Sequence, residues 1–179
     1  MRLRPARSVR KINSQAWSRY SIRKPRKNYV KALPHTSLLV FKMGTPKDDY
    51  NTVASLLSEQ NVQIRSNSLE AARQAANKYL ETSIAGNYYL KVMTYPHNVI
   101  REKKFATGAG ADRISKGMTL TFGKPVSVAA RVFKGTAVFS VRTNLSKKTF
   151  VKEALRRAAS KLSGTYKVAF EPIANNQSA

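Results

Sequence analysis

Lysine and arginine outnumber aspartate and glutamate by 33 to 9 in this chain, and the formal net charge of +24 limits what it can fold into. A surface that repels itself this strongly destabilises a compact fold unless a polyanionic partner neutralises the charge. Nucleic acid is the first candidate for that partner, and an anionic membrane surface is the second. No run of residues approaches the roughly 18 to 20 apolar side chains that a membrane-spanning helix requires. We therefore expect a nucleic-acid partner and no membrane partner.

The positive charge is densest at the N-terminus, where residues 1–34 contain eleven lysines and arginines and no acidic residue. Pro5, Pro25 and Pro34 interrupt any helix that this segment could form. Such a segment cannot bury enough apolar surface to fold alone, so we interpret it as an extension that a bound partner orders. A mitochondrial transit peptide is an alternative interpretation, because such peptides are also rich in arginine and serine and poor in acids.

Short segments with the apolar character of strands recur after residue 35. We predict strands at residues 37–43, 52–60, 62–66, 88–95, 98–103, 126–133, 136–142 and 165–170. The segment 52–60 is also compatible with a helix. Lys134 and Gly135 separate two of the strands by the two residues of a tight hairpin.

Two longer segments, residues 67–81 and 147–162, have helical periodicity. Asn67 and Glu70 predict a capping box at the start of the first helix, and Ser146 predicts a cap at the start of the second. The side chains predicted to face the core are Leu69, Ala72, Ala76, Tyr79, Leu80, Phe150, Val151, Ala154, Leu155, Ala158 and Leu162.

Gly164 lies where a helix commonly ends with a residue in the left-handed conformation. The order of strands, helix, strands, helix and strand indicates a compact α+β fold, a sandwich in which a mainly antiparallel or mixed sheet packs with two helices. We therefore divide the chain into the basic extension 1–34, one α+β domain at 35–172 and a short polar tail at 173–179.

Candidate catalytic groups are few. His35 and His97 each stand beside a proline and have no neighbours at metal-ligand spacing, while Asp48 and Asp49 lie in a turn signal. The chain has no cysteine, so it has neither a disulfide framework nor a thiolate metal site, which is compatible with a reducing cytoplasm. We predict no catalytic residue, no metal site and no cofactor.

The stretch KKFATGAGADRISKGM, residues 103–118, combines glycines with cations and has few apolar residues. Gly108 and Gly110 lack the third glycine of a dinucleotide-binding fingerprint and the Gly-Lys-Ser/Thr of a P-loop. A passive, mobile loop tip is the simplest interpretation. The flanking cations favour a loop that reaches a folded nucleic acid, because glycine permits close backbone approach and cations neutralise phosphate.

Several cations interrupt strands that are otherwise apolar. Arg131 and Arg142 should point away from their apolar neighbours, since successive side chains of a strand alternate between faces. Lys91 shares its predicted strand face with Tyr89, Met93 and Tyr95. That face could stack nucleic-acid bases, but we favour packing of these rings against a helix.

Several motifs together are similar to one known family. They are RPAR at residues 4–7, SLEAARQAANKYL at 68–80, PHNVIREKK at 96–104, ATGAGADRISKGM leading to FGKP at 106–125, and EALRRA at 153–158. In this combination the chain resembles the family of the archaeal and eukaryotic ribosomal large-subunit protein ten-e, whose bacterial counterpart is large-subunit protein sixteen. The resemblance spans about residues 1–172.

The resemblance implies a non-catalytic structural constituent of the large ribosomal subunit, with a hammerhead-like β arrangement. Members of the family bind large-subunit rRNA near the peptidyl-transferase region and direct a long loop, here about residues 100–118, toward tRNA acceptor ends. The expected partners are therefore rRNA, tRNA acceptor ends and neighbouring ribosomal proteins in the cytoplasm, without a homo-oligomer. A general nucleic-acid-binding or chromatin protein is the alternative, and an enzyme acting on RNA is a third interpretation.

The side chains to which we assign these contacts form two groups. The cations expected to bind rRNA are Arg2, Arg4, Arg7, Arg10, Lys11, Arg19, Arg23, Lys24, Arg26, Lys27, Arg101, Lys124, Arg131 and Arg142. The loop residues expected near tRNA are Lys103, Lys104, Phe105, Thr107, Gly108, Gly110, Asp112, Arg113 and Lys116.

Overall fold

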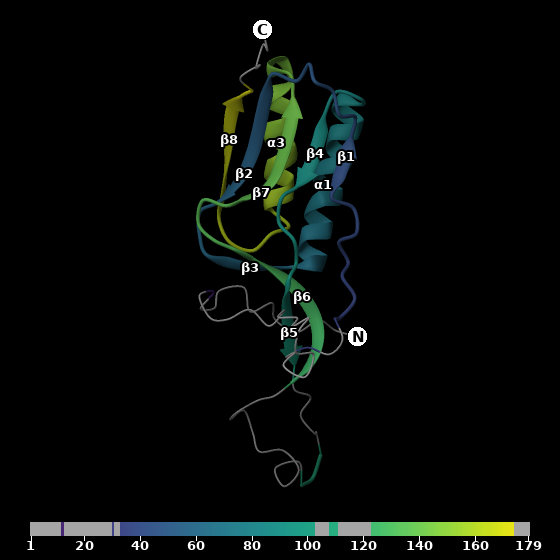
Figure 1. Ribbon diagram of the computed structural model, residues 1–179, viewed down its shortest axis with the longest axis vertical. Helices are drawn as coiled ribbons and strands as arrows, with labels where there is room; N and C mark the ends of the chain where they lie inside the picture. The colour runs from purple at the N-terminus through teal and green to yellow at the C-terminus, as the bar shows by residue number, and fades with distance from the viewer. Residues whose placement is uncertain (1–11, 13–29, 31–32, 103–107, 111–122, 174–179) are drawn as a thin grey trace, which may run out of the picture.

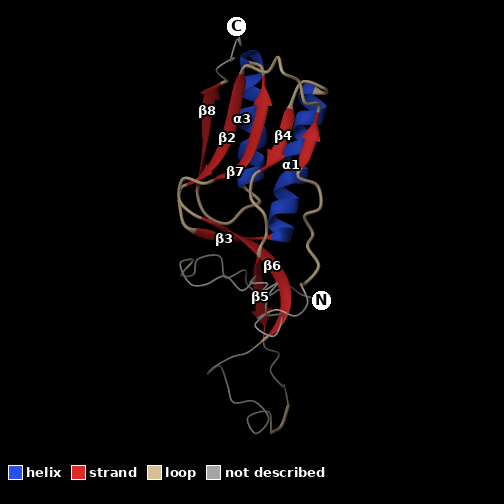
Figure 2. Ribbon diagram, in the orientation of Figure 1, coloured by secondary structure: helices blue, strands red, loops and turns tan. Residues whose placement is uncertain are grey.

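The computed structural model describes residues 12, 30, 33–102, 108–110 and 123–173. These residues form two β-sheets and two α-helices, and every strand pairing among them is antiparallel (Figures 1 and 2). The predicted α+β class is therefore confirmed.

The larger sheet has five strands in the order β1-β4-β7-β2-β8. Their bounds are Lys42–Gly44 for β1, Tyr89–Val92 for β4, Ala137–Thr143 for β7, Thr52–Ser58 for β2 and Tyr166–Pro172 for β8. Alternation decides which face is covered: Ala54 and Leu56 of β2 are buried, whereas Ser55 between them is only half-buried. One face of this sheet is thus packed and the other is open.

Helices α1 (Ser66–Ile84) and α3 (Lys148–Ala159) supply the packing on the covered face. Both lie behind the five-stranded sheet in Figures 1 and 2. Leu69 and Leu80 of α1 and Leu155 of α3 are fully buried, at the helical spacing that the sequence predicts, and they join Phe139 of β7 in one core.

The starts of the two helices differ from the prediction. The N-cap of α1 is Arg65, which makes no side-chain capping hydrogen bond, so the predicted capping box of Asn67 and Glu70 is wrong. The chain enters α1 directly from strand β3, so Asn67 already lies inside the helix. A short 3-10 turn, η2 (Leu145–Lys147), precedes α3, and therefore Ser146 is not its cap.

Two further side chains depart from the predicted helical pattern. Phe150 was expected in the core, but it is 41% exposed, because the buried face of α3 begins at Val151 and continues through Ala154, Leu155 and Ala158. Gly164 has a left-handed φ of 97°, as predicted, although it follows the end of α3 by several residues.

The smaller sheet has three strands in the order β3-β6-β5 and extends away from the five-stranded sheet (Figure 1). Its strands are β3 (Val62–Arg65), β6 (Lys124–Val132) and β5 (Asn98–Glu102). The predicted hairpin between β6 and β7 is wrong, because these strands belong to different sheets. A turn at Lys134 and Gly135 does connect them, but both edges of β7 are already occupied by β2 and β4.

Four positions of the basic extension are described, namely Ile12, Val30, Leu33 and Pro34, and the first two are buried. Val30 is 2% exposed and packs against Val99 of β5 and Val128 of β6, while Ile12 is 5% exposed. The extension thus places one side chain, Val30, against the three-stranded sheet. An isolated valine can add to a core even where the surrounding charged sequence cannot form one.

We expect Gly44→Ala to destabilise the protein by at least about 1 kcal/mol more than Gly86→Ala does. Both glycines have left-handed φ angles, 85° and 70°, so both substitutions strain the backbone. An added Cβ at Gly44 would collide with the carbonyl oxygen of Tyr88, which accepts a hydrogen bond from Thr45 at 3.0 Å, whereas one at Gly86 would meet no atom within 4 Å. Urea unfolding of both variants measures the difference in the free energy of unfolding. Equal losses of stability in the two variants would show that β1 is not held closely against β4.

Candidate nucleic-acid interface

Four of the cations predicted to bind RNA lie in the described part of the chain, and they fall on two different sheets. Arg142 is on β7 of the five-stranded sheet, whereas Arg101, Lys124 and Arg131 are on β5 and β6 of the three-stranded sheet. The ten predicted cations of residues 2–27 lie outside the described residues, as do the predicted loop positions other than Gly108 and Gly110.

The open face of the five-stranded sheet carries a group of positively charged side chains that strand pairing brings together. Lys42 of β1 and Lys91 of β4 are direct cross-strand partners, and both side chains are exposed. Like charges directly opposite each other on one face of an antiparallel pair destabilise it. The sheet therefore maintains a repulsive pair at a place where an anion would be favourable.

Arg142 extends this positive face across the next strand. It is exposed and pairs in register with Tyr89 on one side and Val53 on the other. Lys167 of β8 points to the same face, because it alternates with Tyr166 and the other β8 side chains that pack on the core.

Only one acid accompanies these four cations on the described strands of the open face, namely Glu171 of β8. It pairs in register with Val53, so it lies two strands away from Arg142 and farther from Lys42 and Lys91. The part of the face formed by β1, β4 and β7 is therefore positive and uncompensated by acidic side chains.

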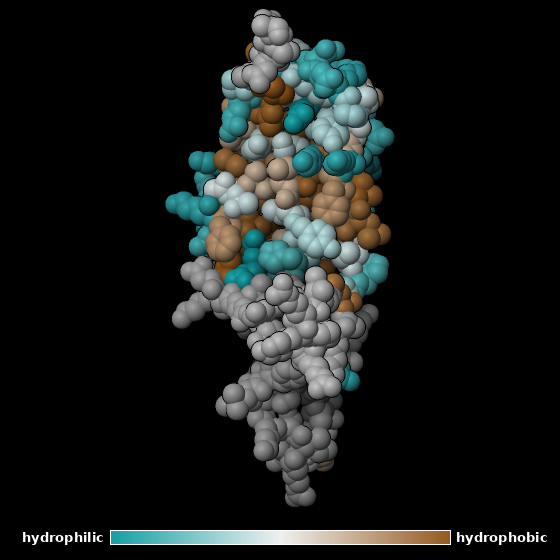
Figure 3. Space-filling model, viewed as in Figure 1, coloured by the Kyte–Doolittle hydropathy of each residue, from teal (hydrophilic) through white to brown (hydrophobic). Residues whose placement is uncertain are grey.

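A shallow hollow of about 90 Å³ lies between β4 and β7 on this face. Its lining consists of Tyr89, Lys91, Met93, Ser140 and Arg142. Figure 3 looks onto this side of the molecule, where hydrophilic and hydrophobic side chains are mixed. The hollow thus brings an aromatic ring and a thioether together with two cations.

The expectation that the Tyr89–Lys91–Met93–Tyr95 face packs against a helix is wrong. Leu90 and Val92, which alternate with these residues, are the buried side chains, so the helices contact the other face of β4. Met93 is 49% exposed and Tyr95 is 60% exposed, and the Tyr95 ring stacks on that of Phe41 with centroids 5.8 Å apart. This leaves exposed aromatic surface beside the cations.

On the three-stranded sheet two of the three predicted cations, Arg101 and Arg131, are only half-exposed. Arg131 is half-buried on the face opposite Val128 and Val132, as predicted, and it pairs in register with Gln63. Arg101 is also half-buried, and burial lowers its pKa from the usual value of an arginine. Lys124 is exposed at the end of β6, paired in register with Glu102.

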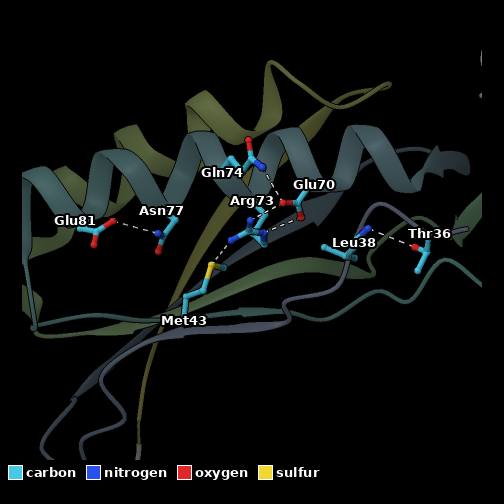
Figure 4. Close-up of polar contacts among 8 residues, drawn as sticks. All are labelled: Thr36, Leu38, Met43, Glu70, Arg73, Gln74, Asn77 and Glu81. Atoms are coloured by element: carbon cyan, nitrogen blue, oxygen red, sulfur yellow. Dashed lines mark hydrogen bonds and ion pairs between the residues drawn. The ribbon is translucent and has the colours of Figure 1, made fainter. Parts of the chain in front are cut away.

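One conspicuous cation of α1 is structural. Figure 4 shows Arg73 pointing from the helix toward β1, where its guanidinium donates to Sδ of Met43 at 2.7 Å and to Oε2 of Glu70 at 2.8 Å. The hydrogen bond from Arg73 lowers the pKa of the Glu70 carboxyl, and Gln74 donates to the same carboxylate. Arg73 therefore holds the edge strand β1 against α1 and is committed to the fold.

Sequence reasoning missed Lys42. The alternation of Phe41, Lys42 and Met43 would have placed Lys42 on the outer face, but no local pattern identifies Lys91 as its cross-strand neighbour. The two lysines are 49 positions apart in the chain, and only the pairing of β1 with β4 brings them together.

Gly108 and Gly110 are exposed and have φ angles of 142° and 77°. An added Cβ at either position would meet no atom within 4 Å, so the space around them within the structure is open. Their conformations are ones that glycine adopts readily and other residues adopt rarely. This is compatible with a loop tip that approaches another molecule closely.

No group of three or more metal-ligating side chains occurs among the residues described by the structure. Within that same portion, neither helix combines the length and apolar character required to cross a bilayer.

Comparisons with known proteins all match ribosomal proteins of one family. The family model described as Ribosomal protein L16p/L10e matches residues 17–169. A large ribosomal subunit protein uL16 from Staphylothermus marinus is 42% identical over 174 residues, which cover 97% of this chain and 96% of the relative. The proteins of the same name from Hyperthermus butylicus and Archaeoglobus fulgidus are 46% and 44% identical, over 89% and 88% of this chain and 88% and 91% of the relatives. These matches confirm the resemblance carried by the sequence motifs, and the chain belongs to the ribosomal protein L16p/L10e family.

Proposed function

We propose that this protein is a structural constituent of the large ribosomal subunit and that it binds large-subunit rRNA through the open face of its five-stranded sheet. The observation that carries the rRNA contact is the cross-strand pair of exposed lysines, Lys42 and Lys91, with Arg142 on the neighbouring strand. A backbone phosphate between the two ammonium groups converts a repulsive pair into two attractive contacts and releases the counterions that each partner holds.

The exposed rings on this face give a second type of contact. A single-stranded base can stack on an aromatic side chain, and such stacking contributes about 1–3 kcal/mol per base. Tyr89 and Met93 line the hollow together with Lys91 and Arg142, so a base placed there would have its phosphates close to cations. Unpaired nucleotides of a folded rRNA present bases in this way, whereas bases inside a duplex do not.

The remaining parts of the proposal concern the basic extension and the loop. In this proposal the extension, residues 1–34, follows rRNA phosphates, and Arg101, Lys124 and Arg131 add contacts from the three-stranded sheet. The loop, about residues 100–118, approaches tRNA acceptor ends near the peptidyl-transferase region, as the family resemblance implies. The protein then acts in the cytoplasm, with rRNA, tRNA and neighbouring ribosomal proteins as its partners.

Membership of a ribosomal-protein family confirms the prediction that the chain is not an enzyme. A general nucleic-acid-binding protein remains the alternative to a specific rRNA ligand. The two differ in salt resistance, because a loosely bound basic protein washes off large subunits at high salt.

We expect the double substitution Lys42→Gln and Lys91→Gln to weaken rRNA binding while slightly stabilising the free protein. Two lost phosphate contacts should reduce the slope of log affinity against log salt by about 1.4 to 1.8, or on the order of 30-fold in affinity at 100 mM salt. Relief of the like-charge pair should raise the free energy of unfolding by about 0.2 to 1 kcal/mol. Filter binding across a salt series and urea unfolding measure the two effects.

The matched control removes two exposed cations elsewhere, Lys134→Gln and Lys152→Gln. Lys134 lies in the turn between β6 and β7, and Lys152 lies on α3, so neither is on the open face. If the control and the open-face variant lose the same salt slope, the open face is not the rRNA site and only net charge matters.

A further inference from the structure

A second basic surface lies on the side of the molecule opposite the open sheet face. A groove of about 640 Å³ runs between α1 and α3, lined by Lys78, Tyr79 and Thr82 of α1 and by Arg157, Ser160 and Lys161 at the end of α3. None of these is among the side chains with which α1 and α3 fill the core beneath the sheet, apart from the partly buried Tyr79. The groove therefore opens on the outer side of the helical layer.

One cation of the groove is fixed in place. The Arg157 guanidinium lies over the Tyr79 ring, 4.1 Å from its centroid, and its Nε donates to Oε1 of Glu153 at 3.0 Å. Glu153 also accepts two hydrogen bonds from Arg156, so both of its oxygens are engaged. Arg157 thus connects the two helices and lines the groove, with part of its charge balanced by Glu153.

Lys78 and Lys161 give the groove a net positive charge. Within the described part of the chain neither lysine forms a salt bridge, and no acid lines the groove. The helix dipole does not explain Lys78, because this residue lies more than one turn before the end of α1, where the dipole effect has faded. Two exposed lysine side chains therefore line a hollow of about 640 Å³.

Two hydroxyl groups of the groove, those of Thr82 and Ser160, donate to backbone carbonyl oxygens and keep acceptor capacity for a ligand. Thr82 donates its hydroxyl hydrogen to the Lys78 carbonyl oxygen at 2.9 Å, and Ser160 donates to the Arg157 carbonyl oxygen at 2.7 Å. Each hydroxyl oxygen keeps lone pairs that can accept a hydrogen bond. The groove thus combines cationic donors, which suit phosphate oxygens, with acceptors, which suit a ribose 2′-hydroxyl.

We propose that the α1–α3 groove binds the sugar–phosphate backbone of a second RNA segment, so that the protein joins two RNA segments on opposite faces. Lys78 and Lys161 contact phosphate oxygens, while the oxygens of Thr82 and Ser160 accept from 2′-hydroxyl groups. The joining of two RNA segments rests on the proposed function, in which the open sheet face binds the first segment. The binding of RNA in the groove does not depend on that function.

The first test uses the full chain with Lys78→Gln and Lys161→Gln. The slope of log affinity for an RNA hairpin against log salt should fall by about 1.4 to 1.8 relative to the unmodified protein. The control Lys134→Gln with Lys152→Gln, which removes the same charge from outside the groove, should change the slope by less than half as much. Equal slopes for the two variants would overturn the groove contact, whatever the open-face variant does.

The second test measures joining directly. An immobilised RNA hairpin should capture a second, fluorescent RNA hairpin only when the full chain is present, and the groove variant should retain binding to the first hairpin while losing most of this capture. A DNA hairpin of the same sequence should be captured several-fold less well, because it lacks 2′-hydroxyl groups. Undiminished capture by the groove variant contradicts the proposal.

An acidic protein segment is the competing occupant, and the same variant distinguishes it. If the groove variant keeps the full RNA salt slope and full capture, yet fails to enter large subunits, the groove contacts a protein and the proposal is wrong. If the Lys42→Gln and Lys91→Gln variant keeps its RNA affinity while the groove variant loses it, the function proposed for the open face is wrong and the groove contact is supported.

Discussion

Deleting Phe105 to Arg113 and joining the ends with a short glycine linker is expected to leave folding and assembly intact while impairing translation. The flanking strands make this feasible, because β5 and β6 pair with each other up to Glu102 and Lys124. Their ends are already adjacent, so a shorter connection does not stretch the sheet, and closing a shorter loop costs no additional entropy. The deleted span has few apolar residues, and the core lies between the five-stranded sheet and the two helices.

The functional loss should be large, at least about tenfold in tRNA binding or in the rate of peptide synthesis, which corresponds to about 1.4 kcal/mol. Thermal unfolding of the free protein and its incorporation into large subunits should remain near normal. A control in which a Gly/Ser segment of equal length replaces Phe105 to Arg113 separates the side chains from the length of the loop. Unfolding of the deletion variant would show that the loop is a structural element, and normal translation would show that it is a spacer.

Replacing all the cations of residues 2–27 by glutamine is expected to cause the largest loss of RNA affinity. The substituted residues are Arg2, Arg4, Arg7, Arg10, Lys11, Arg19, Arg23, Lys24, Arg26 and Lys27. If half of them contact phosphate, the slope of log affinity against log salt falls by about 4 and the affinity at 100 mM salt falls by about 10³-fold or more. Substitution is preferable to truncation, because Ile12 within this segment is buried.

The control for this variant keeps the composition of the extension and shuffles its order, with Ile12 and Val30 left in place. Since counterion release depends on charge rather than on sequence, the shuffled extension should retain most of the salt slope. A slope that does not change when the ten cations are removed would mean that the folded part of the chain supplies the phosphate contacts. The Lys42–Lys91 pair and the α1–α3 groove would then account for the binding.

The local pattern of the sequence was sufficient for much of the fold. The spacing of Leu69, Ala72, Ala76 and Leu80 predicts the buried face of α1, and all four are buried. Alternation predicts that Arg142 is turned away from Phe139 and Val141, and it is exposed while they are buried. These properties depend on residues within a few positions of one another, so they can be read without the tertiary structure.

Two of the errors arose where a second, distant segment competes for the same backbone or surface. Lys134 and Gly135 have the spacing of a hairpin, but β2 and β4 occupy both edges of β7, so β6 pairs in another sheet. The rings beside Lys91 looked like a helix-packing face, but α1 and α3 pack on Leu90 and Val92 instead. Alternation along a strand indicates that the two faces of the sheet differ, but it does not indicate which face a helix will cover.

The sequence by itself determined the charge, the α+β class, the helical faces and the family of this protein, because each follows from composition or from short-range pattern. Only the tertiary structure decided which cations stand together. Strand pairing places Lys42 opposite Lys91, and helix packing places Lys78 beside Lys161 across a groove. Electrostatic interaction depends on distance in space. Residues far apart in a chain become neighbours only when the interactions of the whole fold offset the entropy cost of closing the loop between them.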